Sequence, residues 1–489
     1  MKVLFYSLFN NFISPFAYQL SFIQEEIDKG NEVHILKCNG VLESCHSNLQ
    51  HNIIKCGRCQ DRIEVFSSKL KIPKDRIHNF IKFNEVNTFL TPNFKNTEEL
   101  LDFEYDGVQL GRGVASNIMS RFRDFEISSE KFELLLDIQL KMALTSYLNA
   151  KLVFEKVKPD LVYVYNGRQA EDKPIIQLAE KMGIKYISYV SGANYTKYRK
   201  FENSVVHKLE AVQKDIENCC NSDIPIKEKI TLGENWFKAS REGRELNVKT
   251  FLDKQVKNQL PENFDHNKIN IAIFNSSEDE VKTFDDWKTP LYSEQNDAIK
   301  KIVSFFSNDP NLHFYLRVHP NLGKVKNKQI TEINSFSFFN LTVIPPFSNV
   351  DTYELMDNCS KTITFGSSTG VEATFWGKPS ILYGKSYYDS LDVVYKPKSI
   401  EELAQLIYTE NLETKSKEDA IKYGYYIAEN GTYLSNCEII DSKNILFNGH
   451  SLSKIRPSTF IKILYFLKDT LKWMGPSKNK RYYSSIKTQ

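Results

Sequence analysis

The sequence predicts an α/β protein with two domains, each built around a mostly parallel β-sheet. The chain has 489 residues, and at roughly 100–200 residues per domain two large domains are the simplest division. In both halves, short apolar runs that suit buried strands alternate with longer amphipathic segments that suit helices. This alternation is typical of βαβ units, in which helices connect parallel strands.

The composition excludes several classes of protein. Lys and Arg together number 64 and Asp and Glu number 61, for a formal net charge of +3, so a bulk nucleic-acid binder is not expected. The apolar fraction of 41% and the 33 Phe and 25 Tyr residues indicate a folded chain with a sizeable core. No apolar run reaches the roughly 20 residues of a membrane span, and no cleavage site follows the apolar start. We therefore expect a cytoplasmic protein.

The first domain is expected to cover residues 1–255. It opens with the strand, helix and strand of a βαβ unit, and a long helix later leads into a second such unit. The expected elements are strands 2–8, 32–37, 161–165 and 185–190 and helices 15–29, 129–156 and 174–181. Residues 84–127 contain three glycines and show no clear periodicity, which predicts an irregular insertion.

The second domain is expected to cover residues 265–430. A polar segment, residues 252–268, is the predicted linker, and the α/β pattern restarts after it. The expected elements are strands 269–275, 312–318, 341–344, 361–365 and 379–383 and helices 295–307, 351–358, 370–376 and 400–409. These elements predict a second Rossmann-like domain.

Residues 431–489 are predicted to form a helical tail. Between Lys454 and Lys487 the chain has nine basic residues and one acid, and residues 458–474 place apolar side chains on one helical face. A basic amphipathic helix can lie in a membrane interface, or it can pack on the protein with its basic edge in water. A peripheral position on the inner face of the cytoplasmic membrane is therefore one of two expectations for this tail.

Four of the eight cysteines lie close together in the sequence, at Cys38, Cys45, Cys56 and Cys59. The last two have the spacing of half a zinc site, whereas the first two are spaced more loosely. In a cytosolic protein, reduced and half-buried thiols are the favoured interpretation and a structural zinc ion is the less favoured one. No cofactor is expected to be required.

Polar residues follow three predicted strands of the second domain. Strand 269–275 runs into an acidic, hydroxyl-rich loop, strand 312–318 ends at His-Pro, and strand 361–365 ends in Gly-Ser-Ser-Thr-Gly. Ligands of open α/β sheets bind at the carboxyl ends of the strands, so these ends predict a binding site. The candidate ligand contacts are Ser276, Ser277, Glu278, Arg317, His319, Pro320, Gly366, Ser367, Ser368, Thr369, Gly370 and Glu372.

Each candidate also has a structural alternative. Pro320 excludes a helix at His319 and so keeps the imidazole at the sheet edge, but a plain turn would place it there too. The hydroxyls and N–H groups of residues 367–369 suit a phosphate at a helix start, or one of them only caps the helix. Glu372 can bond ribose hydroxyls or only stabilise the first helical turn. The absence of P-loop, dinucleotide-binding and nucleophile-elbow motifs argues against the corresponding enzyme classes.

These motifs resemble those of GT-B glycosyltransferases that build bacterial surface polysaccharides, and most closely the capsule polysaccharide biosynthesis group, which includes Kdo transferases. Glu278-Asp279, His319-Pro320 and Ser367-Ser368 look like the acidic, HP and SS motifs that GT-B bacterial sialyltransferases also carry. Residues 364–383 are especially similar to the donor site of the capsule group. The resemblance implies a GT-B fold with two Rossmann-like domains facing a central cleft, and it implies that His319, Ser367 and Ser368 hold the donor.

The resemblance also implies a function. We expect a metal-independent glycosyltransferase that moves a sugar from a nucleotide donor, with a CMP-sugar favoured, to a lipid-linked or polysaccharide acceptor of capsule or lipopolysaccharide. In such enzymes the N-terminal domain supplies the acceptor site and the general base. The catalytic candidates there are Asp106, Arg168 and Glu171, and further candidates are Asn10, Asn11, Ser14 and Asn166.

Three alternatives remain open. CDP-polyol phosphotransferases of the teichoic-acid type carry a similar Arg-x-His-Pro and Ser-Ser pattern, and sugar-nucleotide epimerases share the fold. A degenerate site would leave a non-catalytic scaffold of a polysaccharide assembly complex.

Overall fold

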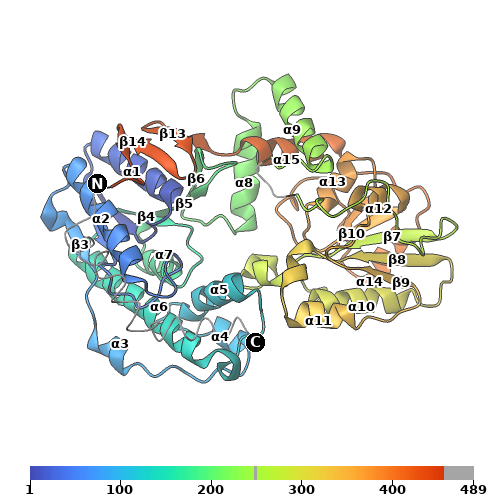
Figure 1. Ribbon diagram of the computed structural model, residues 1–489, viewed down its shortest axis with the longest axis horizontal. Coiled ribbons are helices and arrows are strands. Elements are labelled where there is room, and N and C mark those ends of the chain that lie inside the picture. Colours follow the sequence, from blue (N-terminus) through green and yellow to red (C-terminus); the bar gives the residue numbers. More distant parts are fainter. Residues whose placement is uncertain (247–249, 456–489) are drawn as a thin grey trace. The chain divides into compact units, whose positions relative to one another are not determined.

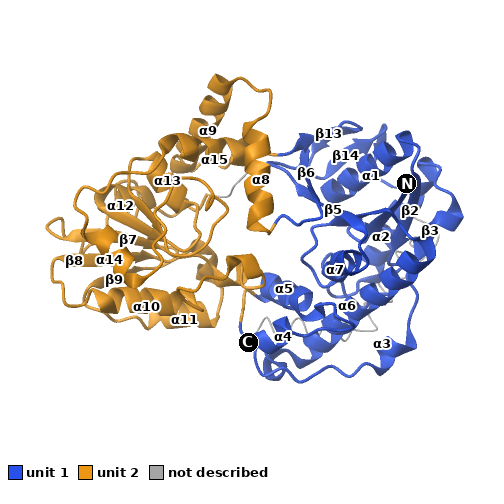
Figure 2. Ribbon diagram, turned by 180° about the vertical axis from the view of Figure 1, so that it is seen from behind, with its two compact units in different colours: residues 1–122, 126–206, 431–489 blue, residues 123–125, 207–430 orange. Residues whose placement is uncertain are grey.

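The structure, a computed structural model, describes residues 1–246 and 250–455. The described chain divides into two compact units, which are coloured separately in Figure 2. Unit 1 contains residues 1–122, 126–206 and the segment from Gly431 onward, and unit 2 contains residues 123–125 and 207–430. The division therefore falls near residue 206, whereas the sequence predicted it at the linker of residues 252–268.

Unit 1 is built on a seven-stranded sheet with the order β12-β6-β5-β4-β1-β2-β3. Its strands are β1 (Lys2–Ser7), β2 (Glu32–Lys37), β3 (Ile77–Asn79), β4 (Leu161–Tyr165), β5 (Lys185–Ser191), β6 (Lys197–Glu202) and β12 (Thr432–Tyr433). The five strands β1 to β5 run parallel, and β6 and β12 add antiparallel pairs at one side. Val3 and Phe5 of β1 face one side of the sheet and Leu4 and Tyr6 the other, and all four are buried. This explains why β1 reads as a continuous apolar run.

Helices cover both faces of this sheet. One face packs against α1 (Ile13–Asp28) and α2 (Ile53–Lys69) in a shared apolar core. The opposite side holds α6 (Ser129–Val157) and α7 (Lys173–Lys181), and the Tyr6 hydroxyl donates to the backbone oxygen of Glu171 just before α7. The parallel strands with helices on both faces confirm the predicted α/β class.

The insertion at residues 84–127 is helical, which corrects the expectation of an irregular segment. Its helices are α3 (Asn84–Thr88), α4 (Thr97–Leu101) and α5 (Leu110–Phe122). Gly113 lies in α5, where an added Cβ would come 2.9 Å from the Cα of Ala170. The glycine, which lowers helix propensity, is thus explained by the close approach of two backbones.

The segment after residue 430 is also different from the prediction, because residues 431–455 form strands and not a helix. After β12 come β13 (Cys437–Asp441), β14 (Asn444–Phe447) and β15 (His450–Ser451), which form an antiparallel sheet. Ile445 and Phe447 are buried in the same core as α1, which makes this segment part of unit 1. The predicted basic amphipathic helix at 458–474 lies outside the described residues.

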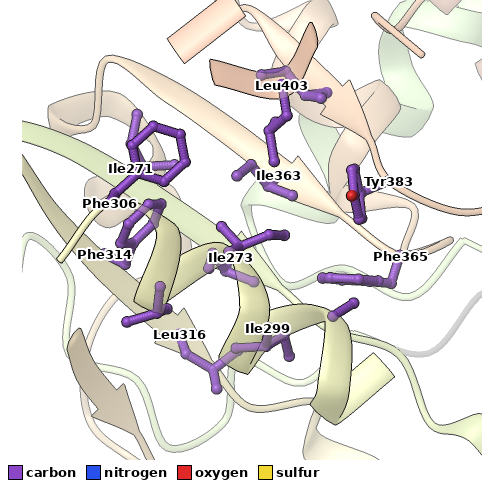
Figure 3. Close-up of a cluster of buried hydrophobic side chains, with 14 of the residues drawn as sticks. Ile271, Ile273, Ile299, Phe306, Phe314, Leu316, Ile363, Phe365, Tyr383 and Leu403 are labelled. Atoms are coloured by element: carbon purple, nitrogen blue, oxygen red, sulfur yellow. The ribbon is translucent and has the colours of Figure 1, made fainter. Parts of the chain in front are cut away.

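Unit 2 is built on a five-stranded parallel sheet with the order β11-β10-β7-β8-β9. Its strands are β7 (Ile269–Phe274), β8 (Leu312–Arg317), β9 (Leu341–Ile344), β10 (Lys361–Thr364) and β11 (Ser380–Leu382). Ile271 and Ile273 point into a core that Figure 3 shows, together with Ile299 and Leu403 from the covering helices. This parallel sheet is Rossmann-like, as predicted.

The helices of unit 2 form a layer on each face of the sheet (Figure 1). The layer in the core of Figure 3 contains α10 (Gln295–Phe305), α11 (Lys328–Asn334) and α14 (Ile400–Tyr408). The other layer contains α12 (Thr352–Asn358) and α13 (Thr369–Phe375). Among the described helices, none has the length and apolar content needed to cross a membrane.

Three further helices account for the boundary near residue 206. They are α8 (Leu209–Cys220), α9 (Ile226–Arg241) and α15 (Lys417–Glu429). Phe237 of α9 stacks on Phe375 of α13 with ring centroids 4.1 Å apart. Gly233 and Gly424 let α9 and α15 approach, since a Cβ on Gly424 would lie 2.6 Å from the Gly233 oxygen. An apolar helix face does not specify its partner, so the sequence could not show that these helices join unit 2.

Candidate functional site

The three polar motifs of unit 2 meet at one edge of its sheet. β7 pairs with β10 on one side and β8 on the other, and because the strands are parallel their carboxyl ends lie together. The backbone N–H of His319 donates to Asn275 Oδ1 at 2.8 Å, and Asn321 Nδ2 donates to Glu280 Oε1 at 2.9 Å. The sheet order reverses between β7 and β10, and such a switch point is where open α/β sheets bind ligands.

His319 presents a neutral imidazole with a defined donor. Its Nδ1 accepts the Asn321 N–H at 3.2 Å, so the proton of the neutral ring is on Nε2. Burial lowers the pKa of His319; nearby Glu280 opposes this shift and Arg123 adds to it. Pro320 follows at the start of a short 3-10 helix (Pro320–Lys324). The Nε2–H group is therefore a hydrogen-bond donor that suits a phosphate or sugar oxygen.

The acidic loop after β7 is mostly buried. Glu278 is 5% exposed, and its Oε1 accepts the N–H of Gln295, the first residue of α10, at 2.6 Å. Ser277 donates to Asp279 Oδ1 at 2.5 Å, and Asp279 is 1% exposed. Ser276 is only partly buried. The two acids of the motif thus fix the loop and the start of α10, which leaves Ser276 better placed for a ligand than Glu278.

Glu278 should make the stability of unit 2 depend on pH. Burial raises its pKa from 4.5 to about 7, so between these values the folded protein binds more protons than the unfolded chain and stability falls as pH rises. The shift corresponds to roughly 3 kcal/mol at most. Glu278→Gln keeps the acceptor oxygen, and we expect it to match the unchanged protein near pH 4 and exceed its stability near pH 8. Denaturant unfolding across this range measures the difference, and parallel curves for the two proteins would contradict the prediction.

Arg123 also belongs to this site, although no sequence motif pointed to it. Its Nε lies 3.0 Å from Asp279 Oδ2, and its Nη2 lies 2.9 Å from Glu280 Oε1 and 3.1 Å from Ser277 Oγ. Its backbone has a positive φ of 57°, and its oxygen accepts from Asn327 Nδ2 at 2.6 Å. A positive φ in a non-glycine residue signals a position that its surroundings determine. The guanidinium neutralises the buried acidic loop.

The Gly-Ser-Ser-Thr-Gly turn after β10 is tightly constrained. Gly366 has φ +124°, and a Cβ there would lie 2.7 Å from the Lys385 oxygen. The Ser367 Oγ accepts from the Thr369 N–H at 3.3 Å and from the Thr369 Oγ1 at 2.8 Å. Gly370 packs against Tyr388, whose hydroxyl would lie 2.3 Å from an added Cβ. The glycines therefore permit a compact turn that carries the Ser367 and Thr369 hydroxyls at the sheet edge.

Ser368 and Glu372 bond to each other. Ser368 Oγ donates to Glu372 Oε1 at 2.9 Å, and the Tyr353 hydroxyl donates to Glu372 Oε2 at 2.5 Å. Burial raises the pKa of Glu372. Both carboxyl oxygens thus have partners within unit 2, which favours the structural interpretation of Glu372 over a ribose contact.

Arg317 supports a cavity wall next to the His-Pro turn. It is 4% exposed, and its Nη1 donates to the Pro345 oxygen at 2.8 Å. Pro345 and the turn residues Leu322 and Gly323 line a cavity of about 710 Å³. Arg317 therefore holds the loop after β9 in place, because its guanidinium donates hydrogen bonds to backbone oxygens of that loop.

The catalytic candidates of unit 1 do not meet at one place. Asp106 forms ion pairs with Lys151 and Lys181 at 2.9 and 3.1 Å, and these bonds hold the pKa of its carboxyl well below its usual range. Lys181 ends α7, which leads into the amino end of β5, whereas Arg168 follows the carboxyl end of β4. Arg168 donates to Ser116 Oγ at 2.9 Å. Asp106 is thus on the opposite edge of the sheet.

Glu171 is fully buried, and both of its carboxyl oxygens accept hydrogen bonds from neighbouring segments. Its Oε1 accepts the backbone N–H of His46 at 2.6 Å, and its Oε2 accepts from Asn117 Nδ2 at 3.1 Å. Three other candidates, Asn11, Ser14 and Asn166, line one cavity of unit 1 together with His46. The sequence therefore identified part of a cavity wall but not His46, whose position depends on the buried carboxylate.

The four clustered cysteines line a common pocket in unit 1. Burial raises the pKa of all four thiols, to about 11 for Cys38 and about 12 for Cys59. Within residues 1–246 and 250–455, no group of three or more His, Cys, Asp or Glu side chains is arranged to hold a metal ion. With pKa values raised in this way, the four thiols are neutral near pH 7.

The sheet edge of unit 2 falls in a segment with a recognised family pattern. Residues 280–409 match the family of capsule polysaccharide biosynthesis proteins. This match confirms the resemblance drawn from the motifs, and it includes His319, Ser367 and Ser368. No curated protein sequence matches the chain.

Solved structures with similar folds include two sugar transferases and an epimerase. The KpsC β-Kdo 2,4 transferase of Thermosulfurimonas dismutans is 14% identical over 54% of this chain and 79% of its own, with a TM-score of 0.35. The β-Kdo 2,7 transferase of the same KpsC is 13% identical over 66% and 89%, with a TM-score of 0.36. The UDP-GlcNAc 2-epimerase of Neisseria meningitidis is 13% identical over 87% and 98%, with a TM-score of 0.27. The assignment of a function therefore depends on the residues of this chain and on the family match.

Proposed function

We propose that this protein is a glycosyltransferase of capsule polysaccharide synthesis that binds a nucleotide-sugar donor at the sheet edge of unit 2. The observation that carries the proposal is the meeting of the His-Pro turn and the Ser-Ser turn on the two strands that flank β7, inside the segment that matches the capsule family. A CMP-sugar is the favoured donor, because the HP and SS motifs suit CMP-activated acidic sugars. The acceptor is a growing surface glycan.

The residues at this edge suit the departure of a phosphate leaving group. In glycosyl transfer, the bond between the sugar's anomeric carbon and the phosphate oxygen breaks, and a bond to the acceptor oxygen forms. The acceptor proton passes to a base, and the nucleotide leaves with the added negative charge. The Nε2–H of His319 and the hydroxyl of Ser367 can donate hydrogen bonds to that charge, and such donors lower the barrier when they are already oriented. Arg123 orders the acidic loop beside them.

His319 provides the test of the donor site. A ligand that binds only the folded state raises the unfolding temperature, and we expect CMP to give the largest rise among CMP, CDP, UDP and GDP. His319→Ala should weaken nucleotide binding roughly tenfold, the effect of losing one hydrogen bond to a charged group. His266→Ala, which alters an exposed histidine of the same unit, is the control and should bind normally. Unchanged affinity in His319→Ala, or no response to any nucleotide, would refute the proposed site.

An assay of the products tests the reaction itself. A new glycosidic bond supports the proposal. A new phosphodiester identifies a polyol phosphotransferase, a free altered sugar identifies an epimerase, and no product despite nucleotide binding supports a scaffold.

A further inference from the structure

The helical insertion of unit 1 exposes large apolar side chains on one surface. Residues 81–104 contain α3 and α4, and α3 lies beside α6 (Figure 1). Leu90 is 88% exposed, Ile81 is 49% exposed and Leu152 of α6 is 44% exposed, although side chains of this kind are usually buried. We call residues 81–104 together with Leu152 the insertion surface. Exposed apolar side chains that share a surface mark an interaction site.

The insertion surface follows the long helix α6. Asn149 Nδ2 donates to the Ile81 oxygen at 3.1 Å, and Thr91 Oγ1 donates to Asp137 Oδ1 at 2.8 Å. The part of α6 from Asp137 to Asn149 is about 18 Å long at the rise of an α-helix. Leu152 lies about one turn beyond Asn149, at the same end as Ile81. The exposed apolar side chains therefore form a strip of about this length along α6.

The insertion surface is acidic as well as apolar. Its exposed carboxylates are those of Glu85, Glu98, Glu99, Asp102 and Glu104, and its exposed lysines are Lys82 and Lys95. An acidic surface repels the anionic headgroups of a membrane and attracts a basic partner. The partner that fits this surface is therefore a basic segment that also has an apolar face.

The chain itself contains such a segment. Residues 456–489, which lie outside the described residues, have eight basic side chains and one acid, and we call them the terminal segment. Residues 458–474 carry apolar side chains at the spacing of one helical face, from Phe460 to Met474. In a helix this face would be about 21 Å long. The terminal segment therefore complements the insertion surface in charge, in apolar character and in length.

The described chain ends at the edge of the sheet from which the insertion surface extends. Arg62 Nε of α2 donates to the Leu452 oxygen at 3.1 Å, and Ile455 packs against the core that α2 shares. The chain runs from α2 to the edge strand β3, and the insertion surface begins directly after β3. Residues 456–459 can span up to roughly 14 Å before the apolar face begins. A tethered segment also meets its site at a high effective concentration.

We propose that the terminal segment, residues 456–489, binds the insertion surface of the same chain. Its apolar face covers Ile81, Leu90 and Leu152, and its basic side chains pair with the carboxylates around them. This contact explains why Leu90 has no apolar cover from the described part of the chain. The contact does not involve the sugar chemistry, so its test is separate from that of the proposed function.

Hydrogen exchange of the full chain tests this docking. An isolated helix of this length is only marginally stable in water, so amides of residues 460–474 exchange slowly only if the segment has a partner. We expect them to exchange at least about tenfold more slowly than in Leu90→Asp, which places a charge in the apolar strip. Ile440→Asp, at another exposed apolar residue of unit 1, is the matched control and should keep the slow exchange.

The charges of the insertion surface provide a second arm of the test. Glu98→Gln combined with Glu104→Gln removes two carboxylates and should speed up exchange in residues 460–474, and high salt should have the same effect. A carbodiimide joins carboxylates to lysines in contact with them. In the unchanged protein it should link lysines of the terminal segment to residues 98–104, as mass spectrometry of the digested chain can show.

Other results overturn the inference. Fast exchange of residues 460–474 in the unchanged protein would show that the terminal segment has no partner on the chain. Slow exchange that survives both Leu90→Asp and the double glutamine variant would place the segment elsewhere. If slow exchange requires vesicles of phosphatidylglycerol and phosphatidylcholine, the segment binds a membrane and not the insertion surface. If it requires a high protein concentration, the partner is a second copy of the chain.

Discussion

Arg123→Ala is expected to destabilise unit 2 by about 3 kcal/mol, because the substitution leaves a buried carboxylate without its partner. Asp279 is 0% exposed in its side chain and lies 3.0 Å from the Arg123 guanidinium. For a unit of this size, such a loss lowers the unfolding temperature by roughly 6–12 °C. The loss should grow with pH. Burial already raises the pKa of Asp279, and Arg123 opposes that rise, so without Arg123 the folded protein holds the proton more strongly and loses stability as pH rises.

Calorimetry of the full chain measures this effect, and hydrogen exchange of residues 276–282 locates it. Arg121→Ala is the matched control, since Arg121 is exposed and two positions away, and it should change the unfolding temperature little. Arg123→Lys keeps the charge but not the two-pronged geometry, so an intermediate result is expected. Equal unfolding temperatures for Arg123→Ala and Arg121→Ala would show that the acidic loop does not depend on this residue. A weaker response to nucleotide in Arg123→Ala would connect the ordered loop to donor binding.

Gly366→Ala is expected to disrupt the turn that carries Ser367 and Thr369. The backbone φ of +124° is almost restricted to glycine, and a Cβ would lie 2.7 Å from the Lys385 oxygen. Either the turn after β10 or the segment after β11 that carries Lys385 must therefore move. Strain of this kind costs on the order of 2–3 kcal/mol. Because the turn is at the proposed phosphate position, nucleotide affinity should also fall by about tenfold or more.

Gly377→Ala isolates the steric part of that effect. Gly377 also has a positive φ, +84°, but a Cβ there would meet nothing within 4 Å. It should therefore cost only about 1 kcal/mol of backbone strain and leave nucleotide binding unchanged. If the two variants are equally stable and bind nucleotide equally well, the close approach of Lys385 is not important for the site.

The local elements were largely predictable because their patterns depend on near neighbours. β2, β4 and β9 begin and end at the expected residues, 32–37, 161–165 and 341–344, since each is a short buried run bounded by polar or turn residues. The insertion was mispredicted because Gly111 and Gly113 disfavour a helix in isolation. These glycines are needed because α5 packs closely against neighbouring backbone in the folded protein. A local sequence pattern contains no information about that contact.

The site was predictable at the level of strand ends but not of individual roles. His319 and Ser367 follow parallel strands, so the sequence could place them at a common edge. It could not show that Ser368 and Glu372 bond to each other or that Glu278 holds the start of α10. It also could not bring Arg123 to Asp279 across 156 positions of the chain.

The sequence by itself determined the α/β class, most strand positions and the motif segment that matches the capsule family, because periodicity and short motifs are local properties of the chain. Only the tertiary structure decided that residues 207–241 join unit 2 and residues 431–455 join unit 1. It also decided which polar side chains are bonded internally and which line a cavity. The physical reason is that an apolar face can pack against any apolar surface and a polar group can bond to any suitable donor or acceptor. Which of these contacts forms depends on which segments the fold brings together.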